Sequence, residues 1–415
     1  MCNLHFIRKR NRASYTYAVA GSEQLQKKRL YMIGIVICNY NKKDYIVNCI
    51  RSVLAQSYQD FELYVVDNAS TDGSVETIRS EFPVERLHLI ENKENLGGSG
   101  GFNTGLRLCL EKDYQYLMCV DNDIIMAEDN VERLVAFMEQ HPEVGMAGSK
   151  INLMDAPELL QSFGCVIDFE KYNFFDHHKR EKESEGNIPE FDYCTFVPAC
   201  SLIVRTEVVK KVGVMPEDNF IYWDDMEWGY LVNEAGWKVA VYRDAVIRHK
   251  TGGVATNTFA RYYLWRNRIR FFGKYLPKEK YEDFAEKLLT ELHRMLYGCY
   301  LKGDTNLAQS LYFALMDGIS NRGGMAGEGR ILQRNGSNSL AEILQKEPGR
   351  AVVECKHVFE YKEPYHGEII KDAYSNVITC EEDYYYCRNY ERAREEFLVR
   401  EVPVIVDAME RNFYV

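Results

Sequence analysis

The 415-residue sequence lacks any hydrophobic run of the ~18 or more residues that a membrane-spanning helix needs. The segment MIGIVIC, Met32 to Cys38, is apolar but short, so it predicts a buried strand. No signal peptide is recognisable. Positive charge is also in deficit, since 51 Lys and Arg stand against 62 Asp and Glu and give a net charge of −11. That balance argues against nucleic acid as the main partner.

Cysteine pairs are missing as well. Twelve cysteines are present, but none lies in a CxxC pair or in a metal-ligand spacing. We therefore expect free thiols in a reducing cytoplasm. Basic residues gather within residues 1–29, in the segments RKRNR and KKR. This basic arm has two interpretations: a solvated, frayed terminus, or a segment that contacts anionic lipid headgroups at the inner face of the membrane.

Standard phosphate-binding motifs are absent from the glycine-rich segment NLGGSGGFNTG, Asn95 to Gly105. No Walker A motif occurs, and the dinucleotide pattern GxGxxG fails because its third glycine position is Asn103. The segment does match the nucleophile elbow GxSxG, and Ser99, Asp224 and His249 follow the chain order of an α/β-hydrolase triad. However, the elbow serine follows ENKENLGG rather than a strand. A serine hydrolase and a non-catalytic carbohydrate-binding protein are therefore alternatives to the reading developed below.

Strand and helix patterns alternate from residue 30 onward, which is typical of an α/β fold with a mostly parallel central sheet. Residues ~155–192 are polar and irregular, and they predict a surface excursion. After Phe272 the pattern changes to amphipathic helices. We therefore predict a basic arm (1–29), a catalytic α/β domain (30–275) and a helical or mixed C-terminal domain (276–415).

Polar clusters stand at four places where ligands bind in such folds. They are Asn39-Tyr40-Asn41, Asp67-Asn68, Asp121-Asn122-Asp123 and the glycine-rich segment. In open α/β sheets, ligands bind at the carboxyl ends of strands, so four clusters at one edge outline a nucleotide-sized site. Asp121 and Asp123 are two apart and can face the same way, which suits Mg²⁺ held together with phosphate oxygens. The alternative for this pair is a polar turn with helix-capping aspartates.

A second acidic cluster lies in YWDDMEWG, where Trp223 and Trp228 bracket Asp224, Asp225 and Glu227. Aromatic faces commonly stack on sugar rings, and a carboxylate beside them can act as a general base. The alternative is a helix N-terminus, where the dipole favours acids and the tryptophans belong to the core. Both interpretations can hold together.

Two further segments carry candidate ligand contacts. His249 ends a predicted strand in AVIRHKTGG, where it is either structural or a third metal ligand. The segment RYYLWRNR, Arg261 to Arg268, interleaves arginines with aromatics. That pattern suits contacts to a diphosphate or an acceptor, or an amphipathic helix whose arginines reach solvent.

In combination, these motifs resemble the inverting glycosyltransferases of family 2 with the GT-A fold, from about Met32 to Phe272. The segments that carry the resemblance are VICNYNKKDYIVNCIRSVLAQSYQDFELYVVDNASTDGS, ENLGGSGGFNTG, VDNDI, FIYWDDMEWGYLVNEAGWKV and AVIRHKTGG. NLGGSGGF, the doubled aspartate and YYLWRNR are most similar to bacterial galactofuranosyltransferases, with rhamnosyltransferases next. One departure is Asn122, since galactofuranosyl enzymes often carry aspartate at the middle of that triplet.

The resemblance implies a role for each cluster. Asp67 would accept a bond from the base of a uridine or thymidine diphosphate, and Asp225 would be the catalytic base, with Asp224 positioning the acceptor. The metal ligands for Mn²⁺ or Mg²⁺ would be Asp121, Asp123 and His249. The remaining donor-binding residues would be Asn39, Tyr40, Asn41, Gly97, Gly98, Gly100 and Asn122. The acceptor-binding residues would be Trp223, Glu227 and Trp228.

The same resemblance implies the substrates and the setting. We expect a nucleotide-sugar donor, UDP-galactofuranose ahead of dTDP-rhamnose, and a glycan or lipid-linked acceptor in cell-surface polysaccharide synthesis. We expect a cytoplasmic enzyme with no nucleic-acid partner. Peripheral membrane contact and homo-oligomer formation through residues 276–415 complete the expectations.

Overall fold

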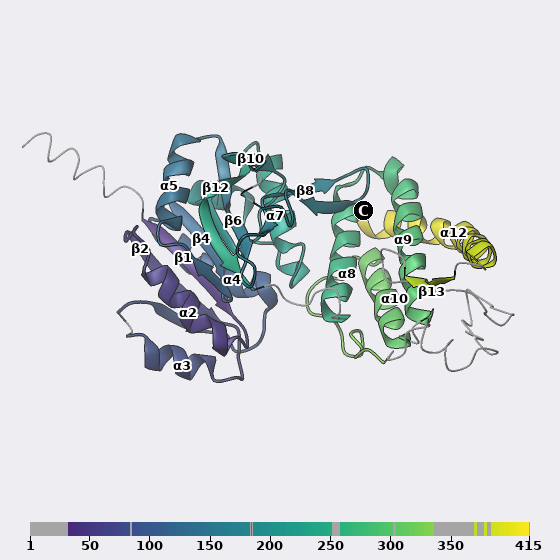
Figure 1. Ribbon diagram of the computed structural model, residues 1–415, viewed down its shortest axis with the longest axis horizontal. Helices are drawn as coiled ribbons and strands as arrows, with labels where there is room; N and C mark the ends of the chain where they lie inside the picture. The colour runs from purple at the N-terminus through teal and green to yellow at the C-terminus, as the bar shows by residue number, and fades with distance from the viewer. Residues whose placement is uncertain are drawn as a thin grey trace, which may run out of the picture. The chain divides into compact units, whose positions relative to one another are not determined.

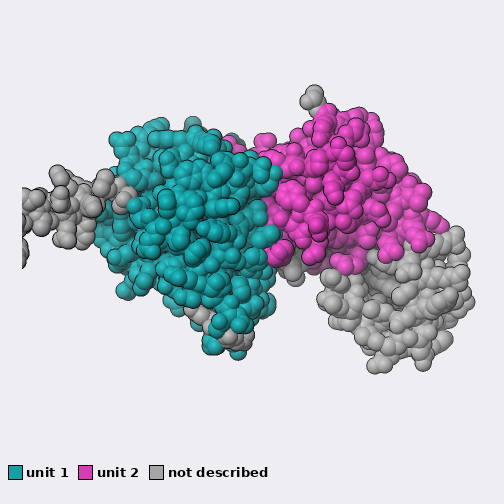
Figure 2. All heavy atoms as spheres, turned by 90° about the horizontal axis from the view of Figure 1, so that it is seen from above, with its two compact units in different colours: residues 1–166, 176–216, 225–251 teal, residues 167–175, 217–224, 252–415 magenta. Residues whose placement is uncertain are grey.

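The computed structural model describes residues 32–83, 85–182, 184, 186–250, 258–301, 304–335, 369–371, 377–379 and 383–414 (Figure 1). The basic arm lies outside the described residues. The chain divides into two compact units (Figure 2). Unit 1 contains residues 1–166, 176–216 and 225–251, and unit 2 contains residues 167–175, 217–224 and 252–415.

Unit 1 is built on a ten-stranded sheet whose main path runs β10-β12-β6-β11-β4-β1-β2-β3. Strands β3, β2, β1 and β4 are parallel, as predicted, whereas β11 is antiparallel to both β4 and β6. The sheet is therefore mixed beyond β4. The strands are β1 (Ile33–Asn39), β2 (Phe61–Asp67), β3 (His88–Glu91), β4 (Tyr116–Asp121), β5 (Ile124–Met126), β6 (Val144–Leu153), β7 (Leu160–Ser162), β10 (Phe191–Cys194), β11 (Ser201–Arg205) and β12 (Lys238–His249).

Helices cover both faces of this sheet. One buried cluster joins the sheet to α2 (Lys43–Leu54), α3 (Ser74–Glu81) and α5 (Asn130–Gln140). The other joins it to α4 (Gly97–Leu110), α6 (Thr206–Val212) and α7 (Asp224–Glu234). Central strands such as β1 are apolar along their whole length because both of their faces are buried in this way. The α/β prediction is confirmed.

The glycine-rich segment is part of a helix rather than a loop before one, because α4 begins at Gly97. Its small residues bring the helix close to β1. A Cβ atom at Gly105 would lie 2.4 Å from Cγ1 of Val36, and one at Gly101 would lie 2.3 Å from Sγ of Cys38. Gly97 itself has a φ of 79°, which glycine adopts without strain. Close packing on the sheet thus accounts for two of the five glycines.

Unit 2 contains the helices α8 (Thr258–Tyr275), α9 (Tyr281–Leu301), α10 (Thr305–Ile319) and α12 (Asp383–Phe413), with short strands β13 (Ile369–Lys371) and β14 (Val377–Thr379). The helical C-terminal region is as predicted. The predicted catalytic domain ends at residue 275 and so includes helix α8. In the structure α8 belongs to unit 2. The small hairpin of β8 (Cys165–Asp168) and β9 (Asn173–Asp176) contributes residues to both units. No helix in the described ranges is long and apolar enough to cross a membrane.

Two arginines of α8 bind backbone carbonyls inside the fold. Arg266 and Arg270 are almost fully buried, and their guanidinium groups donate to backbone carbonyls of Asn219 and Asp218 respectively. The amide of Asn267 donates to the carbonyls of residues 219, 221 and 222. The helix therefore holds the turn before α7, and these arginines satisfy backbone acceptors instead of reaching solvent.

Candidate active site

The predicted polar clusters meet at one edge of the sheet. Strands β1, β2 and β4 are parallel and in register, with Asn39 opposite Asp67 and Cys38 opposite Asp121. Their carboxyl ends therefore share one edge. The Asn122 amide donates to Oδ1 of Asn39 at 2.9 Å, and the Asn39 amide donates to Oδ2 of Asp67 at 2.8 Å. A hydrogen-bond chain thus crosses three strands and links the acidic triplet to Asp67.

The loop after β1 is fixed against the loop after β2. Asn41 has a φ of 50°, its backbone N–H donates to Oγ of Ser70, and its side-chain oxygen accepts from the N–H of Thr71. Tyr40 is 44% exposed, so its ring is open to solvent at the strand edge. An exposed ring directly after β1 is available to a flat ligand such as a base. Both residues therefore lie where the sequence analysis expects donor contacts.

Asp121, Asp123 and His249 form a cluster, with one ligand atom from each lying within 4.8 Å of the others. Nε2 of His249 lies 3.1 Å from Oδ1 of Asp123 and 4.0 Å from Oδ2 of Asp121. His249 reaches this place because β12 pairs antiparallel with β5, the short strand that follows the acidic triplet. The geometry brings together the three residues that the sequence analysis named as metal ligands.

Burial and charge perturb every group of this cluster. Burial, followed by the charge of Asp123, raises the pKa of Asp121 to about 6. Burial also opposes the charged form of Asp123, but bonds to His249 and Lys42 outweigh it and lower the pKa of Asp123. The pKa of His249 is raised, because its contacts with Asp123 and Asp121 outweigh its burial. Carboxylates this close repel one another, so the cluster favours an added cation.

Two residues that the sequence analysis did not single out complete the cluster. The side-chain amide of Gln161, on β7, contacts Nδ1 of His249, with its nitrogen at 2.9 Å and its oxygen at 3.1 Å. The ammonium of Lys42 lies 2.9 Å from Oδ2 of Asp123. Lys42 directly follows Asn41, so its position beside a predicted cluster could have flagged it. Gln161 comes from the polar stretch at residues 155–192, where nothing in the pattern marks it.

This donor set fits a divalent cation. When Nδ1 of His249 donates to Gln161, Nε2 keeps its lone pair and faces the two carboxylates. Carboxylate and imidazole ligands together suit hard or borderline divalent metals. Asp121, Asp123 and His249 are therefore a candidate metal site.

Asp225 lies close enough to the acidic triplet for its charge to raise the pKa of Asp121. Its Oδ2 accepts from the backbone N–H of Ala199 at 3.1 Å, and Oδ1 accepts from the N–H of Met226. Burial raises its own pKa to about 6 in spite of these bonds. An aspartate with that pKa is suited to accept a proton near neutral pH. Asp224 precedes Asp225 in the chain, is the first residue of α7, and is also buried.

Both tryptophans of the second acidic cluster are buried. Trp223 is 1% exposed and packs edge-on against Phe174 and Phe272 in unit 2. Trp228 is 0% exposed, lies in the core of unit 1, and donates its indole N–H to the carbonyl of Gly213. Neither ring as placed offers a face to an acceptor sugar. Glu227 is also buried, at 3% exposed.

Ser99 lacks the surroundings of a nucleophile. It is fully buried in the first turn of α4, and its hydroxyl has no hydrogen-bond partner among the described residues. A hydrolase serine needs a base within hydrogen-bond reach. The arrangement therefore gives no support to a serine hydrolase.

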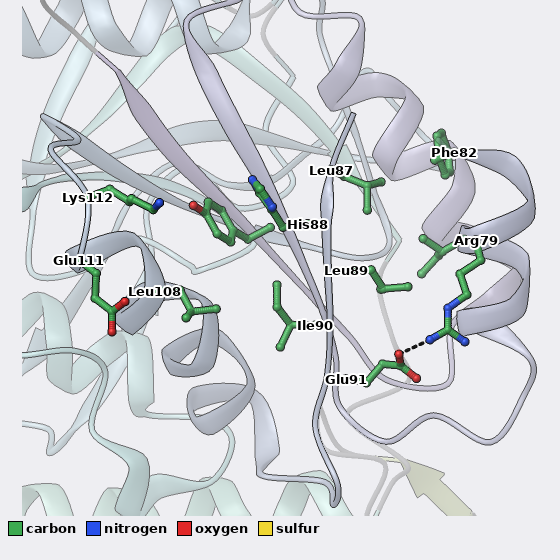
Figure 3. A pocket seen from close by; sticks show the side chains of 12 residues that line it. Arg79, Phe82, Leu87, His88, Leu89, Ile90, Glu91, Leu108, Glu111 and Lys112 are labelled. Atoms are coloured by element: carbon green, nitrogen blue, oxygen red, sulfur yellow. Dashed lines mark hydrogen bonds and ion pairs between the residues drawn. The ribbon is translucent and has the colours of Figure 1, made fainter. Parts of the chain in front are cut away.

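A separate groove of about 840 Å³ lies along the edge strand β3, lined by residues of α3 and α4 (Figure 3). Arg79 and Glu91 form an ion pair at its rim, and Ile90 and Leu108 contribute apolar surface. None of its lining residues belongs to the acidic clusters. The groove is therefore distinct from the candidate metal site.

Comparison with known proteins points to a glycosyltransferase family. Residues 34–213 match the model of the family described as glycosyl transferase family 2. This range contains the acidic triplet, Asp67 and the glycine-rich segment. It ends before Asp225 and His249.

Among curated proteins, an uncharacterised glycosyltransferase of Haemophilus influenzae is 23% identical over 228 residues, which cover 55% of this chain and 68% of that protein. The galactofuranosyltransferase GlfT2 of Mycobacterium tuberculosis is 24% identical over 264 residues, which cover 57% of this chain and 40% of that protein. A putative teichuronic acid biosynthesis glycosyltransferase, TuaG, of Bacillus subtilis is 30% identical over 108 residues, 26% of this chain and 42% of that protein. The chain thus spans less than half of two of these three relatives.

Among solved structures, that of GalNAc-T7 with UDP, GalNAc and Mn²⁺ aligns with a TM-score of 0.50 and 13% identity, covering 63% of this chain and 51% of that one. At this identity the likeness concerns the fold, and it agrees with the predicted GT-A architecture. The sheet, the aligned strand ends and the family match agree with one another: residues 34–213 are similar to a glycosyl transferase family 2 domain.

Proposed function

We propose that the protein is a metal-dependent, inverting glycosyltransferase that uses a nucleotide-sugar donor. The observation that carries the proposal is the cluster of Asp121, Asp123 and His249, with ligand atoms within 4.8 Å of one another and Asp225 within electrostatic reach. In this proposal, those three residues hold Mn²⁺ or Mg²⁺. The bound cation would stabilise the negative charge of the departing diphosphate without a proton.

The chain's own residues supply the rest of the chemistry. Asp225 takes the proton from the acceptor hydroxyl as that oxygen attacks the anomeric carbon, and the bond from that carbon to the diphosphate breaks. A single displacement with one base inverts the anomeric configuration. The raised pKa of Asp225 makes its carboxylate a stronger base than an ordinary aspartate. Asp224 is proposed to position the acceptor.

Recognition of the nucleotide is assigned to the edge formed by β1 and β2. Asp67 is held by Asn39 and by the backbone N–H of Ser70, which fixes its carboxylate at the strand end. Fixed acceptors of this kind suit the N–H of a pyrimidine base. The exposed ring of Tyr40 and the loop at Asn41 would border the same base. Asn122 would act through Asn39 rather than by itself, since its amide donates there.

For the donor we propose UDP-galactofuranose, ahead of dTDP-rhamnose. The support is the glycine-rich segment, the doubled aspartate and the likeness to GlfT2 over 57% of this chain. Gly97, Gly98 and Gly100 would leave room for the wider furanose with its exocyclic diol, because glycine lets backbone approach a ligand. The acceptor is proposed to be a glycan or a lipid-linked glycan in cell-surface polysaccharide synthesis. The relative TuaG is named for teichuronic acid biosynthesis.

We place the enzyme in the cytoplasm, with the basic arm contacting the inner face of the membrane and residues 276–415 forming the oligomer contact. Deletion of residues 1–29 is expected to weaken binding to anionic liposomes without lowering transfer to a soluble acceptor. If the full-length and the truncated protein bind anionic liposomes equally well, the basic arm does not contact the membrane.

Incubation of the purified protein with each donor and Mn²⁺ or Mg²⁺ tests the proposed function. We expect metal-dependent release of UDP from UDP-galactofuranose, and a transferred sugar whose anomeric configuration, read by NMR, is opposite to that of the donor. Faster consumption of dTDP-rhamnose would replace the donor assignment alone. Absence of metal-dependent turnover with every nucleotide-sugar would refute the function.

A further inference from the structure

The ammonium of Lys42 occupies a particular place in the candidate metal site. It lies 2.9 Å from Oδ2 of Asp123, while Oδ1 of the same carboxylate lies 3.1 Å from Nε2 of His249. Both oxygens of Asp123 are therefore engaged by a positively charged or protonatable group. Lys42 is thus a direct partner of a proposed metal ligand.

The backbone at Lys42 is held by hydrogen bonds, whereas its side chain is partly exposed. Lys42 stands at the cap position directly before α2, and its carbonyl accepts from the N–H groups of Tyr45 and Ile46. The preceding residue, Asn41, is bound to the loop after β2. The lysine side chain is 39% exposed. A flexible four-carbon stem on a rigid base lets the ammonium exchange one anionic partner for another.

A divalent cation bound by Asp121, Asp123 and His249 would change the electrostatic surroundings of the Lys42 ammonium. The cation would take the charge of Asp123 and repel the nearby ammonium, since like charges at this range oppose each other. The closest new anion would be a phosphate group of a nucleotide that shares the cation with the carboxylates. Charge-assisted bonds from lysine to phosphate are strong, and lysine commonly binds phosphate as a point charge.

We propose that Lys42 is a phosphate-binding residue that exchanges partners: it competes with the divalent cation for Asp123, and it pairs with the donor diphosphate once that cation is bound. The inference rests on the proposed function, which supplies the diphosphate. It assigns to Lys42 opposite effects on two affinities. Lys42 weakens binding of the metal alone and strengthens binding of the nucleoside diphosphate.

The test compares Lys42→Met with the matched variant Lys43→Met. Lys43 is the next residue, is exposed, and begins α2, where its backbone N–H donates to Asp72. Both variants remove one positive charge from the same helix end. Calorimetric titrations would measure Mn²⁺ alone, and then UDP and UMP at saturating Mn²⁺. These readouts do not depend on turnover.

For Lys42→Met we expect Mn²⁺ alone to bind several-fold more tightly, and UDP to bind about 10- to 100-fold more weakly, as loss of a charged hydrogen bond predicts. UMP should lose less than UDP, because it carries one phosphate. Lys43→Met should match the wild type in all three titrations. Lys42→Arg should retain the preference for UDP over UMP.

Three outcomes would count against the inference. If Lys42→Met and Lys43→Met behave alike, Lys42 has no special role. If metal affinity rises but UDP affinity is unchanged, Lys42 is only an ion-pair partner of Asp123 and the phosphate assignment is wrong. If the wild type binds Mn²⁺ but no nucleoside diphosphate, the proposed function is wrong, and the phosphate-binding role of Lys42 is wrong for the same reason.

Discussion

The side-chain amide of Gln161 contacts Nδ1 of His249, with its nitrogen at 2.9 Å and its oxygen at 3.1 Å, so a residue of β7 orients the imidazole that faces the two aspartates. Hydrogen bonds of this kind fix the tautomer of a ligating histidine and raise its basicity. The two residues lie far apart in the sequence, and they meet because β7 and β12 both pair with β6.

Gln161→Leu should therefore weaken Mn²⁺ binding by about 10- to 100-fold, the usual effect of losing such a partner. Calorimetric titration of Mn²⁺ measures it directly. Gln140→Leu, at the exposed end of α5, makes the same substitution away from the cluster and should leave the affinity unchanged. Equal affinities for the two variants would show that Gln161 does not orient a metal ligand.

Asp123→Ala should abolish metal-dependent binding of the nucleotide while leaving the fold intact. Asp123 contacts both His249 and Lys42, and it lies in a turn after β4 rather than in a hydrophobic cluster. Titration of UDP in the presence of Mn²⁺ measures the loss, and circular dichroism checks the fold. Unchanged UDP affinity in a folded variant would contradict the metal assignment.

Asp225→Asn should lower turnover by roughly 10²- to 10⁴-fold with little change in donor affinity, because the amide keeps the shape and loses the basicity. Steady-state transfer rates and UDP titrations separate the two effects. Asp224→Asn is the matched control on the neighbouring acid. If Asp224→Asn is the crippled variant and Asp225→Asn is mild, the two roles are exchanged.

The pH dependence of transfer should reflect the same residue. Asp225 acts as a base only when it has lost its proton, and burial raises its pKa from 3.8 to about 6. Activity should therefore be at its plateau above that pH and fall as the pH drops through about 6. A profile of kcat against pH checks this. An acid limb near pH 4 would mean that Asp225 titrates as an ordinary aspartate in the complex.

Gly105→Ala should destabilise unit 1 by about 1–3 kcal/mol, the typical cost of overpacking a tight core. The added methyl would lie 2.4 Å from Cγ1 of Val36, closer than real contacts allow. Thermal unfolding measures the change. Gly327→Ala, whose nearest neighbour is 3.8 Å away, is the control. Adding Val36→Ala to Gly105→Ala should recover part of the loss, and no recovery would mean that the strain lies elsewhere.

The sequence by itself predicted the class of fold and the candidate metal ligands. Apolar runs such as β1 and β4 end in polar residues, and parallel strands have their carboxyl ends at one edge, so the pattern predicts that Asp67, Asp121 and Asp123 lie near one another. The pairing of β1 with β2 and β4 comes from the tertiary structure. His249 was identified through the order of motifs along the chain. The α/β alternation and the later helices follow from periodicity, which local sequence carries.

Tertiary structure alone decided what surrounds those ligands. The sequence analysis assigned Trp223 and Trp228 to acceptor binding, but both side chains are buried. Their burial depends on elements that are distant in the chain, and the local sequence does not show which elements pack over them. The same is true of the buried arginines of α8 and of Gln161, which pairing to β6 brings to His249. Local sequence determines which polar side chains stand at the end of each strand. Long-range packing determines which of those side chains lie close to one another.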